Sequence, residues 1–237
     1  ESVITDTDPL LKKVLGGYYL TAKIGRGGMS KVYRGLPEQT LELDEAVAVK
    51  VIDEDLADSE EYRARFRREI EVCASINNPN VVKLIDWGEK EKLLFMVQEL
   101  IDGQTLKQAC KEPLSQARFV HIFVPILRAL KAAHSKGVIH RDLKPDNLLI
   151  VPISDGTIQV KVLDFGIARA LETNTQLTAT GMVCGTPQYM APEQAQNSEL
   201  GPATDLYALG VMLYEMMTGQ VPFMADSPVK ILTKHVF

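Results

Sequence analysis

The chain has 237 residues, of which 46% are hydrophobic and 24% charged, a composition typical of a globular protein. Its formal net charge of −5 argues against a general nucleic-acid binder, which normally carries a basic excess. No apolar run in the sequence reaches the length of a membrane span. The three cysteines are far apart and fit no metal-binding spacing, so we expect reduced thiols and a cytoplasmic location.

The first part of the chain is expected to form a small sheet with one helix. Residues 1–16 are weakly patterned and are interpreted as an N-terminal leader. Between residues 18 and 51, short β-prone stretches alternate with glycine and proline, which predicts antiparallel strands and hairpins. Apolar residues at helical spacing predict a helix over residues 59–76, and two further strands are expected over 81–85 and 93–100.

After residue 102 the pattern becomes mainly helical. An apolar stripe over residues 119–133 predicts a long helix, which Pro125 should kink or break. Further expected elements are two strands, a threonine-rich loop and a buried helix, at residues 148–151, 157–163, 171–186 and 203–218. Gly219 is expected to end the last of these helices.

A glycine-rich string lies between two of the predicted strands. It reads Gly25-Arg26-Gly27-Gly28-Met29-Ser30-Lys31-Val32. A strand-to-helix position would indicate a dinucleotide-binding fold, whereas a position between strands favours a flap whose backbone amides approach phosphates. The alternative interpretation is an ordinary tight hairpin.

Two acidic strings in the helical part suit phosphoryl transfer. They read His140-Arg141-Asp142-Leu143-Lys144-Pro145-Asp146-Asn147 and Asp164-Phe165-Gly166. Phosphoryl transfer needs a carboxylate that orients a hydroxyl group, and oxygen ligands that hold Mg²⁺ against phosphates. The residue types of these two strings match both needs.

Taken in this order, the motifs resemble the eukaryotic-type protein kinase superfamily. The triplet Asp142-Leu143-Lys144 resembles its serine/threonine variant. The glycine-rich string, with Ser30 at the family's third glycine, resembles the bacterial (Pkn-like) serine/threonine protein kinases. The resemblance implies the α+β, two-lobed protein kinase fold, with a β-rich N-lobe at residues 17–101 and a helical C-lobe at 102–237.

The resemblance also implies that the C-lobe is incomplete. Family members continue with further helices beyond the position of Phe237, so the chain is expected to be truncated at its C-terminus. Those helices normally supply a partner for the residue at Glu193. We therefore expect Glu193 to be an unpaired buried carboxylate and the chain to be less stable than a longer one.

By resemblance, five residues carry the catalytic chemistry. Asp142 would orient the substrate hydroxyl and accept its proton, and Lys144 would neutralise charge on the transferring phosphoryl group. Thr186, in the segment that positions the acceptor, would hydrogen-bond both of them. Lys50 would hold the α- and β-phosphates, and Glu69 would pair with Lys50.

The resemblance implies ATP and Mg²⁺ as cofactors, with Mn²⁺ as an alternative ion. Asn147 and Asp164 would hold the metal, and Asp205 would anchor the backbone of the catalytic loop. The expected nucleotide-binding residues are Ile24, Gly25, Arg26, Gly27, Gly28, Met29, Ser30, Lys31, Val32, Ala48, Lys50, Gln98, Glu99, Ile101 and Leu149. The family's internal hydrophobic stack would consist of Cys73, Leu84, His140 and Phe165.

A switch is also expected in the threonine-rich loop. By resemblance, Thr178 and Thr180 are the autophosphorylation sites, and Arg65, Arg141 and Arg169 converge on one pocket. Without phosphate the three guanidinium groups repel one another. A phosphate carrying about −1.5 to −2 charge could pair with all three and order the loop.

The leading hypothesis is a protein serine/threonine kinase that acts on protein substrates and phosphorylates itself. The alternatives are a pseudokinase or scaffold that binds nucleotide without turnover, and a small-molecule kinase of the same fold. Lys144, Thr186 and the string Ala191-Pro192-Glu193 favour a polypeptide acceptor. The resemblance also implies a homodimer through the N-lobe, and allows the chain to be the cytoplasmic domain of a membrane receptor kinase. We expect no nucleic-acid partner and no membrane segment in this chain.

Overall fold

The computed structural model describes residues 8–27, 30–53, 59–110, 112–153, 157–165 and 185–237. The chain forms two compact units. One comprises Glu1–Arg65 and Lys83–Leu100, and the other Phe66–Val82 and Ile101–Phe237. The predicted lobe boundaries at 17–101 and 102–237 stay a prediction.

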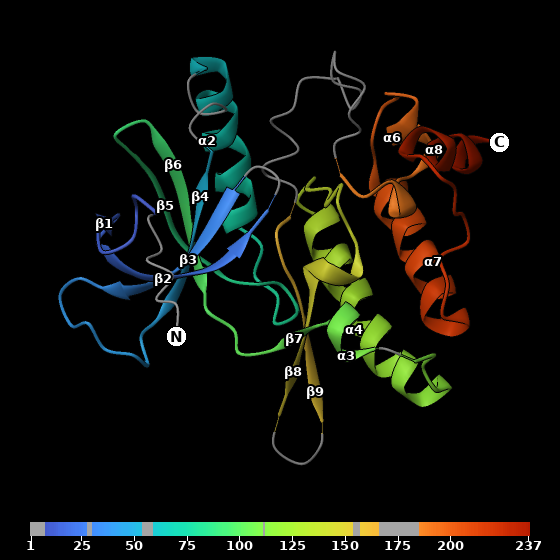
Figure 1. Cartoon of the computed structure of the whole chain (residues 1–237), viewed down its shortest axis with the longest axis horizontal. Coiled ribbons are helices and arrows are strands. Elements are labelled where there is room, and N and C mark those ends of the chain that lie inside the picture. Colours follow the sequence, from blue (N-terminus) through green and yellow to red (C-terminus); the bar gives the residue numbers. More distant parts are fainter. Residues whose placement is uncertain (1–7, 28–29, 54–58, 111, 154–156, 166–184) are drawn as a thin grey trace. The chain divides into compact units, whose positions relative to one another are not determined.

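A six-stranded antiparallel sheet dominates the first unit (Figure 1). Its strands, in the order in which they lie in the sheet, are β1 (Val14–Leu15), β2 (Tyr18–Arg26), β3 (Ser30–Pro37), β4 (Val47–Ile52), β6 (Leu93–Glu99) and β5 (Leu84–Lys90). The hairpin between β5 and β6 has a two-residue loop in which Glu91 and Lys92 both have positive φ. This backbone is that of a type I′ turn, whose twist matches that of the flanking strands.

The two faces of this sheet have different side chains. Strand register places Tyr33, Val49 and Val97 side by side, and all three are fully buried in a hydrophobic cluster. Because side chains alternate along a strand, the intervening residues lie on the opposite face. There Val32 pairs with Lys50. The hydrophobic core of the unit therefore lies on the face opposite the predicted nucleotide-binding residues Val32, Ala48, Lys50 and Gln98.

Helix α2 (Glu60–Ala74) confirms the helix predicted over residues 59–76. Tyr62, Phe66 and Ile70 recur at a spacing of four residues and are all buried. Full burial of one such side chain stabilises the fold by about 1.5–3 kcal/mol. At the helix start, the Ser59 hydroxyl accepts a hydrogen bond from the backbone amide of Tyr62 (3.3 Å).

The second unit is mainly helical and contains a three-stranded sheet (Figure 1). Its elements are β7 (Gln104–Thr105), α3 (Leu106–Ala109), α4 (Gln116–His134), η1 (Pro145–Asn147), β8 (Leu148–Pro152), β9 (Ile158–Val162), η3 (Pro187–Tyr189), α6 (Pro192–Ala195), α7 (Pro202–Thr218) and α8 (Pro228–Val236). One hydrophobic cluster joins Ile126 of α4, Val160 of β9 and Met212 of α7. The cluster thus holds the long helices and the small sheet as one body.

Several expectations for these elements are confirmed and two are wrong in part. Helix α7 ends where predicted, since Gly219 adopts a φ of 79° and its amide bonds to Glu215 O (2.7 Å). Helix α4 is not broken at Pro125 but runs on to His134. The strand expected over 81–85 is displaced along the chain: β5 begins at Leu84, and Val81 makes an isolated bridge with Val162 of β9.

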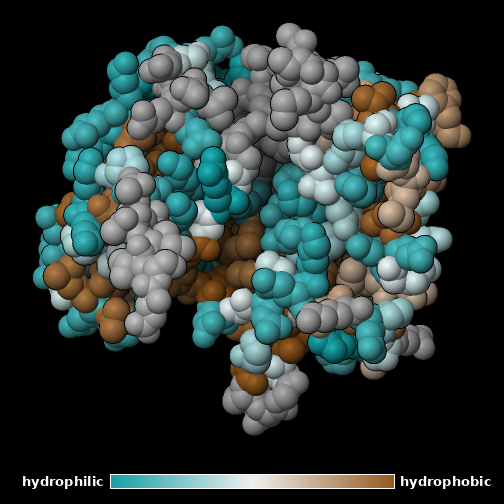
Figure 2. Space-filling view, viewed as in Figure 1, coloured by the Kyte–Doolittle hydropathy of each residue, from teal (hydrophilic) through white to brown (hydrophobic). Residues whose placement is uncertain are grey.

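On the face drawn in Figure 2, brown hydrophobic residues lie among teal hydrophilic ones. Within the described ranges, no helix combines the length and apolar character that a membrane crossing needs.

Replacing Gly16 by alanine should destabilise the first unit strongly. Gly16 has a φ of 59°, and an added Cβ would lie 2.3 Å from the Phe95 ring. Gly17→Ala is the matched control, because Gly17 also has a positive φ (82°) but no atom within 4 Å of its added Cβ. We expect about 1–2 kcal/mol of backbone strain in both variants, and about 1–3 kcal/mol more in Gly16→Ala. Chemical denaturation measures both; equal losses would contradict the steric argument.

Candidate active site

Asp205, near the start of α7, holds the backbone of the 140–147 loop. Its Oδ2 accepts the backbone amide of His140 (2.8 Å) and its Oδ1 that of Arg141 (2.9 Å). His134 Nε2 donates to the same carboxylate at 2.7 Å. Asp205 is fully buried, and its role as loop anchor, predicted from sequence, is confirmed.

Asp205 remains ionised despite its burial. Burial alone would raise its pKa, but the hydrogen bond from His134, the electrostatic interaction with His140 and the two backbone amides outweigh burial and hold the pKa below its ordinary value. A carboxylate that accepts several hydrogen bonds in its charged form is stabilised in that form. The charge therefore helps to fix the loop.

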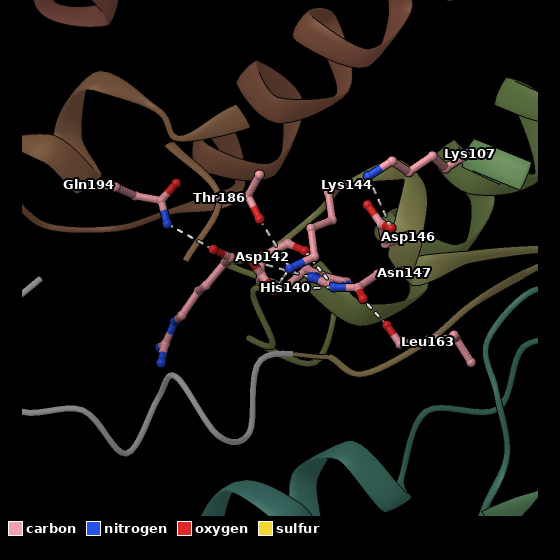
Figure 3. A network of polar contacts seen from close by, with 10 residues as sticks. Lys107, His140, Asp142, Lys144, Asp146, Asn147, Leu163, Thr186 and Gln194 are labelled. Carbon is pink, nitrogen blue, oxygen red and sulfur yellow. Dashed lines mark hydrogen bonds and ion pairs between the residues drawn. The ribbon is translucent and has the colours of Figure 1, made fainter. Parts of the chain in front are cut away.

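The loop presents a polar cluster around Asp142, shown in Figure 3. Lys144 Nζ lies 2.9 Å from Asp142 Oδ2 and donates to Thr186 Oγ1 at 3.3 Å. Asn147 Nδ2 donates to the Asp142 backbone oxygen (2.8 Å) and to Asp142 Oδ2 (3.3 Å). Three predicted catalytic residues and one predicted metal ligand are thus brought together by direct contacts.

Asn147 and Asp164 are placed close along the connected backbone. The amide of Leu163 donates to the backbone oxygen of Asn147 (2.9 Å), and Asp164 follows directly. Because the Asn147 amide nitrogen bonds to Asp142, its side-chain oxygen remains as a donor atom for a metal. An amide oxygen and a carboxylate are ligand types that suit Mg²⁺.

Two residues of this region have a left-handed backbone that side chains usually avoid. Arg141 has a φ of 65° and Asp164 a φ of 51°. Such conformations cost about 1–3 kcal/mol each and persist only where the surroundings enforce them. For Arg141, two hydrogen bonds enforce this backbone. Its amide donates to Asp205 Oδ1, and the Gln194 side chain donates to its backbone oxygen (2.8 Å).

His140 connects the loop to the predicted hydrophobic stack. Its Nε2 donates to Leu163 O (2.8 Å), and its Nδ1 accepts the amide of Asp142 (3.3 Å). Its ring lies 5.0 Å from that of Phe165, and the Cys73 thiol lies 4.0 Å from Phe165 O. Burial, with a smaller effect of the charge of Glu69, raises the pKa of Cys73 to about 12. Cys73 is therefore an inert thiol with a packing role.

Four predicted nucleotide-binding residues of the first unit, Val32, Ala48, Lys50 and Gln98, share one face of its sheet, whereas Lys31 and Glu99 pair with Val51 and Val47 on the core face. Val32 pairs with Lys50, which pairs with Met96, and Ala48 pairs with Gln98. Ser30 opens β3 and is buried, without positive φ. The backbone at position 30 therefore does not need a glycine.

The remaining predicted residues fall into three groups. Ile24 to Gly27, Lys31 and Glu99 belong to the first unit, whereas Glu69, Ile101 and Leu149 belong to the second. The pairing of Lys50 with Glu69 therefore stays a prediction. Arg65 pairs with Glu61 at 2.7 Å. Gly28, Met29, Arg169, Thr178 and Thr180 lie outside the described residues.

Sequence reasoning was wrong about one carboxylate and missed several contacts. Glu193 is half-buried and accepts a hydrogen bond from the Thr204 hydroxyl (2.7 Å), so it is not an unpaired charge. Gln194 and His134 were not anticipated, because their partners lie far away in sequence. The Tyr189 hydroxyl donates to Glu215 (2.7 Å), and this hydrogen bond connects η3 to helix α7.

These elements define the two-lobed protein kinase fold: a curled antiparallel sheet bearing a glycine-rich hairpin, and a helical unit with an Asp-Lys-Asn loop. A solved kinase domain, PknI of Mycobacterium tuberculosis, matches with a TM-score of 0.70 at 23% identity, over 91% of this chain and 79% of that one.

Sequence comparison identifies the family. The protein kinase domain model matches residues 18–236, and the chain belongs to the protein kinase domain family. Serine/threonine-protein kinase pkn3 of Myxococcus xanthus is 44% identical over 98% of this chain and 43% of that protein. Serine/threonine-protein kinase PrkC of Bacillus subtilis is 39% identical over 95% of this chain and 34% of its own length. The chain thus spans less than half of either relative.

Removing the loop anchor should destabilise the protein strongly. Asp205→Ala leaves two buried backbone amides and His134 without their acceptor, so we expect a loss of about 3–5 kcal/mol. The matched control is Asp226→Ala, which breaks an exposed pair with Lys230 and should cost about 0–1 kcal/mol. Denaturant unfolding gives both values. A small loss in Asp205→Ala would contradict the role of Asp205 as an anchor.

The buried His235 of α8 should make stability depend on pH. Its Nδ1 lies 2.8 Å from the Tyr207 hydroxyl. Burial lowers its pKa, and the backbone of Gln188 and Pro187 offsets only part of this effect. A histidine whose pKa is lowered by folding stabilises the protein fully above its unfolded pKa of about 6.5, and this contribution is lost as the pH falls through the lower folded value.

We therefore expect wild type to be more stable than His235→Phe at about pH 7.5, and this advantage to shrink towards about pH 5.5. Phenylalanine keeps the ring contacts with Tyr207 and Phe223 but not the hydrogen bond. Melting curves across this pH range measure the difference. The exposed His121→Gln serves as control and should follow wild type. A difference that does not change with pH would refute the assignment.

Proposed function

We propose that the chain is the catalytic domain of a Mg-ATP-dependent protein serine/threonine kinase, which transfers the γ-phosphate of ATP to serine and threonine hydroxyls. The observation that carries this proposal is the Lys144 ammonium group, which contacts both Asp142 Oδ2 and Thr186 Oγ1. It joins the predicted base to the segment that would position an acceptor. The serine/threonine kinases among the relatives support the same reaction.

In the proposed reaction, Asp142 accepts a hydrogen bond from the acceptor hydroxyl and takes its proton as the hydroxyl oxygen bonds to the γ-phosphorus, the bond between that phosphorus and the β-phosphate oxygen breaks, and ADP leaves. Lys144, held beside Asp142, offsets the negative charge that develops on the transferring group. Thr186 keeps Lys144 in place and contributes a hydroxyl next to the acceptor.

The proposal includes the nucleotide-binding residues that the sequence predicts. In the first unit, the glycine-rich hairpin would cover the phosphates, Lys50 would pair with them and Glu69 would orient Lys50. Val32, Ala48 and Leu149 would enclose the adenine ring, with backbone bonds from Glu99 and Ile101 beside Gln98. Asn147 and Asp164 would hold Mg²⁺, which neutralises phosphate charge when bound.

Regulation by autophosphorylation is part of the proposal. Phosphate on Thr178 or Thr180 would pair with Arg141, Arg169 and Arg65, and so order the acceptor-side loop. Protein substrates are the proposed partners, and an N-lobe homodimer is a further proposal. We place the reaction in the cytoplasm, where ATP is available; the free thiols of Cys73 and Cys110 agree with that location.

Incubation with Mg-ATP followed by phosphosite mass spectrometry tests the function. We expect phosphate on Thr178 or Thr180 in wild type, and transfer slowed by about 10²- to 10⁴-fold in Asp142→Asn, which lacks the base. Thr178→Ala/Thr180→Ala should retain transfer to a peptide of residues 171–186, at a reduced initial rate. Nucleotide binding without any transfer would instead identify a pseudokinase or scaffold.

A further inference from the structure

The side chain of Asp8 is almost fully buried against the β2–β3 hairpin, with only 4% of it exposed. Its Oδ1 accepts hydrogen bonds from the Tyr33 hydroxyl (2.9 Å) and the backbone amide of Leu10 (3.2 Å). Its Oδ2 lies 3.5 Å from Lys23 Nζ and 3.8 Å from Lys31 Nζ. Side chains from both strands of the hairpin therefore converge on one carboxylate.

This carboxylate is charged at neutral pH. Burial alone would raise the pKa of Asp8, but the bonds from Tyr33 and Leu10 and the charges of Lys31 and Lys23 outweigh burial and hold the pKa below its ordinary value. The cluster is thus a buried charge with its partners in place. Removing the carboxylate would leave two lysines of like charge beside each other.

Strand register shows on which side of the hairpin Asp8 binds. Lys23 pairs with Tyr33, and Lys31 is two residues from Tyr33, so these three side chains share one face. Val32 lies between Lys31 and Tyr33 and faces the other way, towards the side of Lys50. Asp8 therefore holds the hairpin from the face opposite Val32 and Lys50, close to the last strand pair before the glycine-rich turn.

The segment that carries Asp8, residues 8–15, is attached to β2 along its length; we call it the N-terminal strap. The backbone of Lys12 donates to Leu20 O (2.8 Å), and the amide of Leu20 donates to Lys13 O (2.9 Å). Leu15, in β1, is buried in the hydrophobic cluster of the sheet. The strap thus holds β2 near its beginning through β1 and near the glycine-rich turn through Asp8.

We propose that the N-terminal strap positions the glycine-rich hairpin for nucleotide, and that Asp8 is its positioning residue, acting through Tyr33 and the two lysines. The inference rests on the proposed function, because it takes the hairpin as the cover of the ATP phosphates. A hairpin that is held from behind keeps its backbone amides in the binding geometry before nucleotide arrives. If the strap is released, nucleotide binding must also order the hairpin. The free energy that this ordering costs weakens the affinity for nucleotide.

The test compares MgADP binding by calorimetry in wild type, Asp8→Ala, Asp8→Asn and Tyr33→Phe. Asp8→Ala should bind about tenfold more weakly, the loss that one charge-assisted hydrogen bond can account for. Tyr33→Phe should lose less, and its effect should not add to that of Asp8→Ala, because both break the same bond. Asp8→Asn keeps an acceptor for Tyr33 but not the charge, and should lie between wild type and Asp8→Ala. Asp44→Ala, an exposed charge-matched control, should match wild type.

Kinetics and hydrogen exchange complete the test. In Asp8→Ala, KM for ATP should rise about tenfold while kcat and KM for the acceptor peptide stay within about twofold. Amides of residues 23–34 should exchange faster than in wild type.

Lower melting temperatures with unchanged MgADP affinity in all variants would overturn the positioning role and leave the kinase function intact. Tighter binding in Asp8→Ala would also overturn it, since the hairpin held by Asp8 would then not be the form that binds nucleotide best. Absence of MgADP binding in wild type would overturn both proposals.

Discussion

The buried carboxylate of Asp205 is the interaction on which the catalytic half of the molecule depends. One side chain near the start of α7 accepts the amides of two consecutive loop residues and the imidazole of His134. Without this acceptor, the left-handed backbone at Arg141 would lack its main support. The position of Asp142, and hence its contacts with Lys144 and Asn147, follows from that backbone.

Much of the fold can be read from local pattern. The spacing of Tyr62, Phe66 and Ile70 is sufficient to predict α2, and Gly219 marks the end of α7. Elements whose partners are distant are not predictable in this way. Val81 forms its bridge with Val162 of β9, which lies some eighty residues further along the chain, and it is therefore not part of the nearby strand β5. Pro125 stays within α4, where the packing of the buried face outweighs its local cost.

In the candidate site, too, some residues are predictable from local sequence and others are not. Asp142, Lys144, Asn147 and Asp205 can be recognised from residue type and order alone. Direct contacts join the first three, and Asp205 holds the backbone of the neighbouring residues His140 and Arg141. The residues that support them are ordinary in sequence: Gln194 is one glutamine among several, and Asp8 lies in a stretch with no clear pattern. Their importance comes from burial and from hydrogen bonds across long sequence separations.

The separation of the two faces of the first sheet also restricts how the chain can vary. Tyr33 and Val32 are adjacent, yet one belongs to the hydrophobic core and the other to the face with Lys50. Inserting or deleting one residue inside β3 would exchange these faces, placing core residues on the ligand side and ligand residues in the core. Among related proteins, insertions and deletions should therefore occur in loops such as residues 38–46, while β3 and β4 keep their lengths.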